Sequence, residues 1–519
     1  MRAMSLIVAL GWLVAAVAVR GAERPDVEQL LKHEIIGSVL PLAEVQRFCE
    51  TRVIRMPEVK TADGWCQQAE RIRSAVLERV IYRGEAARWR DAATRVQWLE
   101  TIDGGPGYRI RKLRFEALPG LWIPALLYEP LELSGKVPGV LNVNGHTALG
   151  KQYPPKQIRC INQAKRGILA LNVEWLGMGQ LRGPGYGHDR MNQLDLCGTS
   201  GLAPFYLLLK RSLDLLLSLD HVDPQRVAVT GLSGGGWQTI VISALDERVK
   251  LSNPVAGYSS FRTRAYHFKD LGDSEQTPTD LATVADYTHL TAMLAPRPAL
   301  LTYNAKDNCC FESGYALEPL LDAARPIYEL FGRLDALRHH VNHEPGTHNY
   351  EQENREVFYQ MLADFFYPDD PDFRVQEIPC EDEIKTAEQL AVPLPEDNAT
   401  FQSLALGLAK DLPRCEALPK DEAGQRAWRR RQRRRLAQIV RAVRYSVQPI
   451  QRGQEEQPPL HATFWQLKMD GTWTVPAVEL AGPEPRGTAL LVADEGRAAL
   501  ATQAEALVDD GHRVVAIDP

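Results

Sequence analysis

The sequence lacks the features that mark several common classes of protein. It has no C-x-x-C pair, the spacing that zinc knuckles and thioredoxin-like redox sites use. Basic residues are not in excess, since 60 Lys and Arg are set against 66 Asp and Glu, for a formal charge of -6. Nucleic acid and anionic membrane surfaces are therefore not expected as partners. After the N-terminal region no apolar run is long enough to span a bilayer. We also expect neither a cofactor nor a metal ion.

Cysteine is sparse as well. Eight cysteines in 519 residues do not make the disulfide-dense scaffold of a small secreted domain, and their pairing cannot be read from the sequence. Cys309 and Cys310 either brace their loop or remain free thiols.

An apolar run from Leu6 to Val19 lies close to the N-terminus and gives way to polar residues. The run is short for a membrane span and is typical of a signal-peptide core. We expect a signal peptide over residues 1–22, with the protein secreted or periplasmic. An uncleaved N-terminal anchor is the alternative.

A chain of 519 residues is long enough to form two or more domains. From shifts in composition and periodicity we expect five parts: a signal peptide (1–22), a helical segment (23–98), a catalytic domain (99–367), a Pro- and acid-rich linker or cover (368–420) and a partial second unit (421–519).

Within 99–367 short apolar runs alternate with helical patterns. This alternation predicts a mostly parallel sheet covered by helices on both faces. The expected strands are 108–117, 121–128, 137–143, 167–173, 227–230, 251–256 and 298–303, and the main expected helices are 203–219, 237–245 and 351–366.

A Gly-x-Ser-x-Gly motif, Gly231 to Gly235, stands between one of these strands and a helix. A strand, a tight glycine turn and a helix make the nucleophile elbow of α/β-hydrolases, which exposes a serine hydroxyl above the sheet edge. Ser233 is the candidate nucleophile, and it needs a histidine base and an acid.

The sequence offers both partners downstream. Asp307 follows an expected strand, and His348 lies in a loop directly before the final helix. The order Ser233, Asp307, His348 is that of α/β-hydrolases. Other acids are held in reserve for the role of Asp307: Asp270, Asp273 and Glu312.

The tetrahedral anion of ester hydrolysis needs preorganised donors. We expect the backbone N–H of Gly234 to be one donor, and that of His146 or Thr147, in the turn after an expected strand, to be the second. A second group of histidines is close enough in sequence to suggest a metal cluster: His339, His340 and His343. Their spacing splits them between the two faces of a presumed strand, so we expect them to be structural or on the surface.

These segments resemble a known family. The run VDPQRVAVTGLSGGGWQT (222–239), with RSLDLLL before it, is similar to secreted bacterial α/β-hydrolases of the acetyl xylan esterase-like or prolyl-oligopeptidase-like group. LAPRPALLTYNAKD and PGTHNY match the acid and histidine segments of that group. The resemblance implies Ser233, Asp307 and His348 as the triad, and hydrolysis of acyl esters on polysaccharide. Glucuronoyl esterases carry an Arg shortly after the serine, whereas this chain has Gly234 and Gly235.

Elements of residues 65–173 recur in order after residue 420. An N-terminal helix that begins near a tryptophan, a strand pair and two further apolar runs suggest a diverged, incomplete repeat of the α/β-hydrolase fold. The basic run Arg426 to Arg435 is then a solvated helix face rather than a nucleic-acid patch. No second elbow follows, so we expect the sequence to be a fragment of a longer two-unit chain.

The leading hypothesis is a secreted serine carboxylic-ester hydrolase that acts on acetyl-type esters of carbohydrates. A serine peptidase of the prolyl-oligopeptidase type and a non-catalytic binding protein of hydrolase fold are the alternatives.

Overall fold

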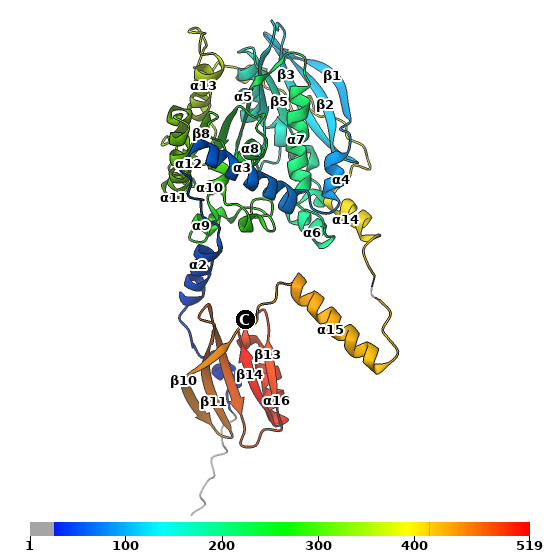
Figure 1. Ribbon diagram of the computed structural model, residues 1–519, viewed down its shortest axis with the longest axis vertical. Coiled ribbons are helices and arrows are strands. Elements are labelled where there is room, and N and C mark those ends of the chain that lie inside the picture. The colour runs from blue at the N-terminus through cyan, green and yellow to red at the C-terminus, as the bar shows by residue number, and fades with distance from the viewer. Residues whose placement is uncertain (1–24, 415, 519) are drawn as a thin grey trace, which may run out of the picture. The chain divides into compact units, whose positions relative to one another are not determined.

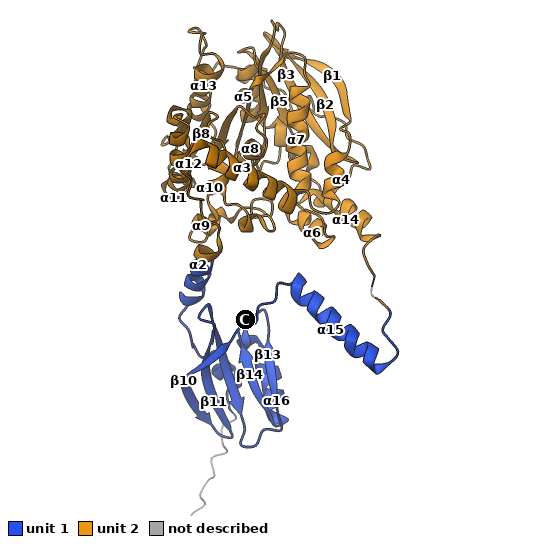
Figure 2. Ribbon diagram, viewed as in Figure 1, with its two compact units in different colours: residues 1–48, 417–519 blue, residues 49–416 orange. Residues whose placement is uncertain are grey.

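The computed structural model describes residues 25–414 and 416–518, so the predicted signal peptide lies outside the described residues. The chain forms two compact units, coloured separately in Figure 2. Unit 2 comprises residues 49–416, and unit 1 combines residues 1–48 with 417–519. The boundary falls inside α2 (Leu40–Arg52). Unit 2 therefore holds not only the expected catalytic domain but also most of the helical segment before it and nearly all of the segment expected as a linker or cover.

Unit 2 is built on a nine-stranded sheet in the order β1-β2-β3-β5-β4-β6-β7-β8-β9. The first three strands are antiparallel, and β4 to β9 are parallel to one another. The strands are β1 (Val96–Gly105), β2 (Tyr108–Leu118), β3 (Leu121–Pro130), β4 (Val137–Asn142), β5 (Leu169–Val173), β6 (Val222–Leu232), β7 (Leu251–Val255), β8 (Ala299–Asn304) and β9 (Leu337–Asn342).

Helices cover both faces of this sheet (Figure 1). Leu141 and Val229 point to one face, where they join the core formed with five helices: α3 (Ala62–Val76), α7 (Ala203–Leu217), α8 (Gly234–Leu245), α10 (Tyr287–Ala292) and α12 (Glu318–Leu330). Val140 and Ala228 point to the other face, where α13 (Gln352–Phe366) packs, and α5 (Pro154–Ala164) packs beside it. Because successive strand residues face opposite sides, burial on both faces makes β5, β7 and β8 apolar or uncharged throughout.

The helices of unit 2 are α3 (Ala62–Val76), α4 (Ala86–Asp91), α5 (Pro154–Ala164), α6 (Asn192–Leu196), α7 (Ala203–Leu217), α8 (Gly234–Leu245), α9 (Phe261–Arg264), α10 (Tyr287–Ala292), α11 (Ser313–Ala316), α12 (Glu318–Leu330), α13 (Gln352–Phe366) and α14 (Phe401–Ala409). The Thr61 side chain caps α3, and Asp286 forms a capping box at the start of α10.

Residues 368–414, which we call the strap, lie on the surface of unit 2. Glu377 forms an ion pair with Arg355 of α13, with Oε1 at 2.7 Å from Nη2. The strap then crosses α5, where Ile378 N–H donates to Asn162, and Asn398 accepts a hydrogen bond from Trp122 N–H of β3. Cys380, Leu390 and Val392 complete an apolar cluster with α5 and β3. The strap is thus a cover with its own buried contacts.

Unit 1 contains a second sheet, in the order β10-β11-β12-β14-β13. Its strands are β10 (Val447–Gln457), β11 (Leu460–Met469), β12 (Trp473–Ala481), β13 (Gly487–Val492) and β14 (His512–Ile517), and its other helices are α1 (Val27–Leu31), α15 (Glu422–Ile439) and α16 (Ala501–Asp509).

The second sheet has the order and directions of the first five strands of unit 2. Only the pair β13–β14 is parallel, as only β4–β5 is among β1 to β5. The expected second unit of the same build is therefore present. The basic run lies on α15, which has no buried residue.

Candidate active site

Ser233 occupies the turn between β6 and α8. Its φ of 61° and ψ of -124° lie in a region that non-glycine residues rarely adopt, as the strained turn of a nucleophile elbow requires. The turn is fixed by the Ser233 N–H, which donates to Val255 O at 2.9 Å. Its neighbours must be small, because a Cβ on Gly231 would lie 2.5 Å from Val143 O and one on Gly234 would lie 2.2 Å from the Trp175 ring.

Asp307 follows β8, and its carboxylate is surrounded by donors. The side chain of Asn304 donates to it at 3.1 Å, and the backbone N–H groups of Cys309 and Cys310 donate at 3.0 and 3.2 Å. The His348 Nδ1 lies 2.8 Å from Oδ2 and 3.0 Å from Oδ1. Burial raises the pKa of Asp307, but the hydrogen bond and charge of His348, together with the hydrogen bonds from Asn304 and Cys309, outweigh burial and hold the pKa below its ordinary value. The carboxylate is therefore ionised and held in one orientation.

His348 lies between β9 and α13, and its backbone N–H donates to Asn308 Oδ1 at 3.1 Å. Burial lowers the pKa of the imidazole, but the hydrogen bond and the charge of Asp307 raise it, and the net pKa is above its ordinary value. The imidazole and Leu232, the residue before Ser233, line one pocket of about 140 Å³. The structure thus brings His348 against Asp307 and to the wall of the pocket that borders the elbow.

A buried asparagine network supports both loops, and the sequence did not point to it. Asn349 and Asn354 donate to Asn304 Oδ1 at 3.3 and 3.2 Å, and Asn349 also donates to Asn342 Oδ1 at 3.0 Å. Because Asn304 in turn donates to Asp307, the network links the acid loop to the histidine loop. The one signal in the sequence is that Asn304 ends a strand and Asn349 directly follows His348.

The turn after β4 packs against the elbow, as expected of an oxyanion turn. A Cβ on Gly145 would lie 3.1 Å from Gly234 N and 2.4 Å from Leu232 O, so only glycine fits there. The Lys156 Nζ donates to Gly145 O at 3.3 Å and fixes the turn from the other side. Gly234 is the first residue of α8, so its N–H has no partner within the helix. The donor roles of Gly234, His146 and Thr147 stay predictions.

The reserve acids and the other histidines lie elsewhere. Asp270 accepts from Phe311 N–H at 2.7 Å and from the Tyr315 hydroxyl at 3.1 Å. The remaining members of these groups are placed as follows: Asp273 contacts the side chains of His146 and His188, Glu312 precedes α11, His339 and His340 lie on β9, and His343 follows it.

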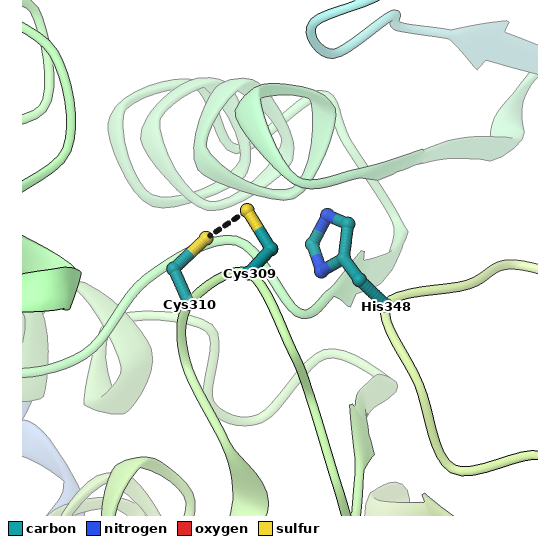
Figure 3. Close-up of side chains that lie close together, drawn as sticks. All are labelled: Cys309, Cys310 and His348. Atoms are coloured by element: carbon teal, nitrogen blue, oxygen red, sulfur yellow. Dashed lines mark hydrogen bonds between the residues drawn. The ribbon is translucent and has the colours of Figure 1, made fainter.

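Two thiols lie beside the acid loop (Figure 3). The Sγ atoms of Cys309 and Cys310 are 3.2 Å apart, and both residues are free thiols, as are the other five cysteines in the described part of the chain. Their contact lowers the pKa of Cys309 and raises that of Cys310. The loop is therefore held by backbone bonds to Asp307 and not by a disulfide.

The fold and the elbow define unit 2 as an α/β-hydrolase. Residues 203–281, which include the whole elbow, match the family model described as acetyl xylan esterase (AXE1). Over this segment the chain is similar to acetyl xylan esterases. None of the helices in the described part of the chain combines the length and the apolar character that a membrane span needs.

Among solved structures, the chain is similar to three esterases. One is the methylesterase BT1017, with 19% identity over 75% of this chain and 80% of that chain and a TM-score of 0.49. Another is a glucuronoyl esterase from Solibacter usitatus, with 15% identity over 60% of this chain and 99% of that chain and a TM-score of 0.46. The third is an acetyl xylan esterase from Paenibacillus sp. R4, with 17% identity over 63% of this chain and 100% of that chain and a TM-score of 0.42. No curated protein matches the sequence.

Proposed function

We propose that unit 2 hydrolyses carboxylic esters of carbohydrates, acetyl esters foremost, through an acyl-enzyme on Ser233. One observation carries the proposal: the strained turn at Ser233 borders the pocket that His348 lines, and His348 Nδ1 lies 2.8 Å from the buried Asp307. The match of residues 203–281 to the acetyl xylan esterase family supports the acyl group and the carbohydrate alcohol.

In this mechanism His348 acts first as a general base. Its Nδ1–H is committed to Asp307, so its Nε2 carries the lone pair that accepts the hydroxyl proton of Ser233. The serine oxygen attacks the ester carbonyl, and a tetrahedral anion forms. His348 then gives its proton to the leaving alcohol, and an acyl ester remains on the serine. Water, deprotonated by the same imidazole, releases the acid and restores Ser233.

Asp307 stabilises the imidazolium that forms in each half-reaction and stays ionised throughout. Its low pKa agrees with that role, because a carboxylate held by four donors does not compete for the proton. The backbone N–H of Gly234 and one from His146 or Thr147 bind the anion. Such donors are worth about 3–4 kcal/mol each to the transition state.

The test compares the full chain with its Ser233→Ala variant on p-nitrophenyl acetate and on acetylated xylan. We expect kcat/KM to fall by at least about 10⁴-fold in the variant. Ser218→Ala, on a serine whose hydroxyl donates to the α7 carbonyl of Leu215, is the matched control and keeps full activity. Mass spectrometry of the trapped intermediate is expected to find one acetyl group on Ser233.

Two results would contradict the proposal. One is equal ester hydrolysis by wild type and Ser233→Ala. The other is cleavage of prolyl-nitroanilides in preference to every ester tested, which would identify the peptidase alternative. Export is part of the proposal and rests on the apolar run over 6–19; recovery of the cleaved chain outside the cytoplasm tests it.

A further inference from the structure

Four metal-ligating side chains meet beside the candidate active site. They come from three loops: His146 follows β4, His188 begins a 3-10 turn (His188–Met191), and Asp273 and Glu275 lie in the loop after α9. His146 Nε2 is 2.6 Å from Asp273 Oδ2, and His188 Nδ1 is 3.0 Å from both Asp273 Oδ2 and Glu275 Oε2. One ligand atom from each residue lies within 4.8 Å of all the others.

The hydrogen bond made by Nε2 of His188 fixes the tautomer of the neutral imidazole. Nε2 lies 2.8 Å from Leu176 O, and a carbonyl only accepts, so Nε2 carries a hydrogen. In the neutral imidazole the Nδ1 lone pair then faces the carboxylates of Asp273 and Glu275, which is repulsive without a cation between them. A ring N–H donated to a backbone carbonyl is also the usual support of a metal-bound histidine.

Glu275 supplies independent evidence for a ligand. Its side chain is 0% exposed, and among the described residues the contact of Oε2 with His188 Nδ1 is the one polar contact that its carboxylate makes. A buried carboxylate with so few donors costs several kcal/mol unless a cation compensates it. Arg264 is also buried, but its Nη1 donates to Gln276 O at 2.7 Å. The Glu275 carboxylate is therefore directed into the cluster with nothing but His188 Nδ1 beside it among the described contacts.

We infer that His146, His188, Asp273 and Glu275 bind one divalent transition-metal ion, Zn²⁺ by preference. Two imidazole nitrogens and two carboxylate oxygens form a four-coordinate set, which Zn²⁺ takes at about 2.0–2.2 Å from each ligand. His146 and Asp273 are 36% and 47% exposed, so an ion enters from solvent, while His188 and Glu275 are buried.

The ion would brace the expected oxyanion turn. His146 directly follows Gly145, which packs on Ser233, and its ring lies 4.8 Å from that of Trp175. Trp175 also contacts His188, at 4.5 Å between ring centroids, and it lies against Gly234. Coordination of His146 therefore holds the backbone of this turn in place, a positioning role that goes beyond the proposed triad.

A proton is the competing occupant. Burial lowers the pKa of His188, but the hydrogen bonds to Asp273 and Glu275 outweigh it and raise the pKa to about 10 in the absence of an ion. An imidazolium shared by two carboxylates would then form a purely structural ion cluster. Such a cluster binds no metal, so metal binding separates the two occupants.

The experiment uses the full chain, stripped with a chelator and titrated with Zn²⁺. We expect one Zn²⁺ per chain by elemental analysis after gel filtration. Glu275→Gln and Asp273→Asn are expected to weaken Kd by at least about 100-fold, because each removes a direct ligand. Glu312→Gln, a carboxylate outside the cluster, is the matched control with unchanged Kd, and thermal unfolding of each variant verifies that it is folded.

In the described part of the chain, the thiols near His348 form the other group of possible Zn²⁺ ligands, and Cys309→Ser/Cys310→Ser measures their contribution. The inference predicts unchanged Zn²⁺ binding in this double variant, and a Co²⁺ complex without sulfur charge-transfer bands. It is overturned if wild type binds no Zn²⁺, if Glu275→Gln and Asp273→Asn bind as wild type does, or if the thiol variant abolishes binding. The readout is binding, so it fails or succeeds independently of the proposed esterase activity.

Discussion

Asp307→Asn is the most informative single change in the proposed triad. The carboxylate accepts from the side chain of Asn304, from two backbone N–H groups and from His348. An amide of the same shape keeps an acceptor oxygen for the backbone donors. Its NH₂ group, however, turns toward His348 Nδ1 and selects the tautomer with the hydrogen on Nε2. That tautomer cannot take the proton of Ser233.

The expected magnitude follows from that switch. In serine hydrolases with this constellation the same substitution lowers kcat by about 10⁴-fold, equivalent to about 5.5 kcal/mol of transition-state stabilisation. Loss of the acid leaves the elbow and the oxyanion donors in place, so activity above the Ser233→Ala level remains. We expect kcat/KM on p-nitrophenyl acetate to fall by about 10⁴-fold.

The pH profile supplies a second, independent readout. His348 must be neutral to act as a base, so activity is present above its pKa and is lost as the pH falls through it. Asp307 raises that pKa, whereas burial lowers it. When the carboxylate is removed, the lowering effect of burial on the pKa of His348 remains. The acid limb of kcat/KM therefore moves to lower pH.

Asp270→Asn is the matched control. Asp270 is also buried, but it bonds to Phe311 N–H and the Tyr315 hydroxyl. Its replacement is expected to lower Tm and to leave the acid limb unmoved. The assignment of Asp307 would be refuted by an Asp307→Asn enzyme that keeps more than about a tenth of wild-type kcat/KM, or by an acid limb that stays in place.

Three further changes test the scaffold around the site. Gly145→Ala places a Cβ 2.4 Å from Leu232 O; the turn must shift, and kcat/KM is expected to fall by about 100-fold in the ester assay. Glu377→Ala leaves Arg355 buried without its carboxylate, and we expect urea unfolding to report a loss of about 3–5 kcal/mol; a change below 1 kcal/mol would contradict the strap contact. Tyr350→Phe removes a hydroxyl 2.8 and 2.9 Å from two buried polar groups of β6 and β7, for an expected loss of about 1–3 kcal/mol.

The triad candidates were visible in the sequence for a physical reason. Parallel strands buried on both faces are short apolar runs, and polar residues placed where such runs end must gather at one edge of the sheet. Asp307 follows one such run, and Ser233 follows another. The structure places Asp307 in contact with His348, as that reasoning expects.

The metal-ligand candidates could not be found in this way. His146 and Asp273 are 127 residues apart, and neither lies in a spacing pattern typical of a metal site. The sequence draws attention to a different group, His339, His340 and His343, and gives no reason to expect a metal ion at His146. Proximity here depends on how three loops fold against one another, and loop conformation is not encoded in apolar periodicity.

The strands at the sheet edges and the strap were also difficult to predict from the sequence. β1 and β10 expose many of their residues, so their sequences lack the apolar alternation that marks a strand. The strap is polar and rich in proline, yet it buries Leu390 and Val392 and bonds through side chains of α5. Its few apolar anchors are too widely spaced to form a periodic pattern.

The strap affects where unit 2 can be truncated at its C-terminal end. All three residues of the proposed triad precede Phe366, so the proposed catalytic residues are all present by the end of α13. A chain cut there would, however, bare the apolar surface of α5 and β3 that Cys380, Leu390 and Val392 cover. Exposed apolar surface of this kind promotes association between chains. The shortest chain that contains all the proposed catalytic residues therefore ends with α13. The shortest chain that also resists association must include the strap.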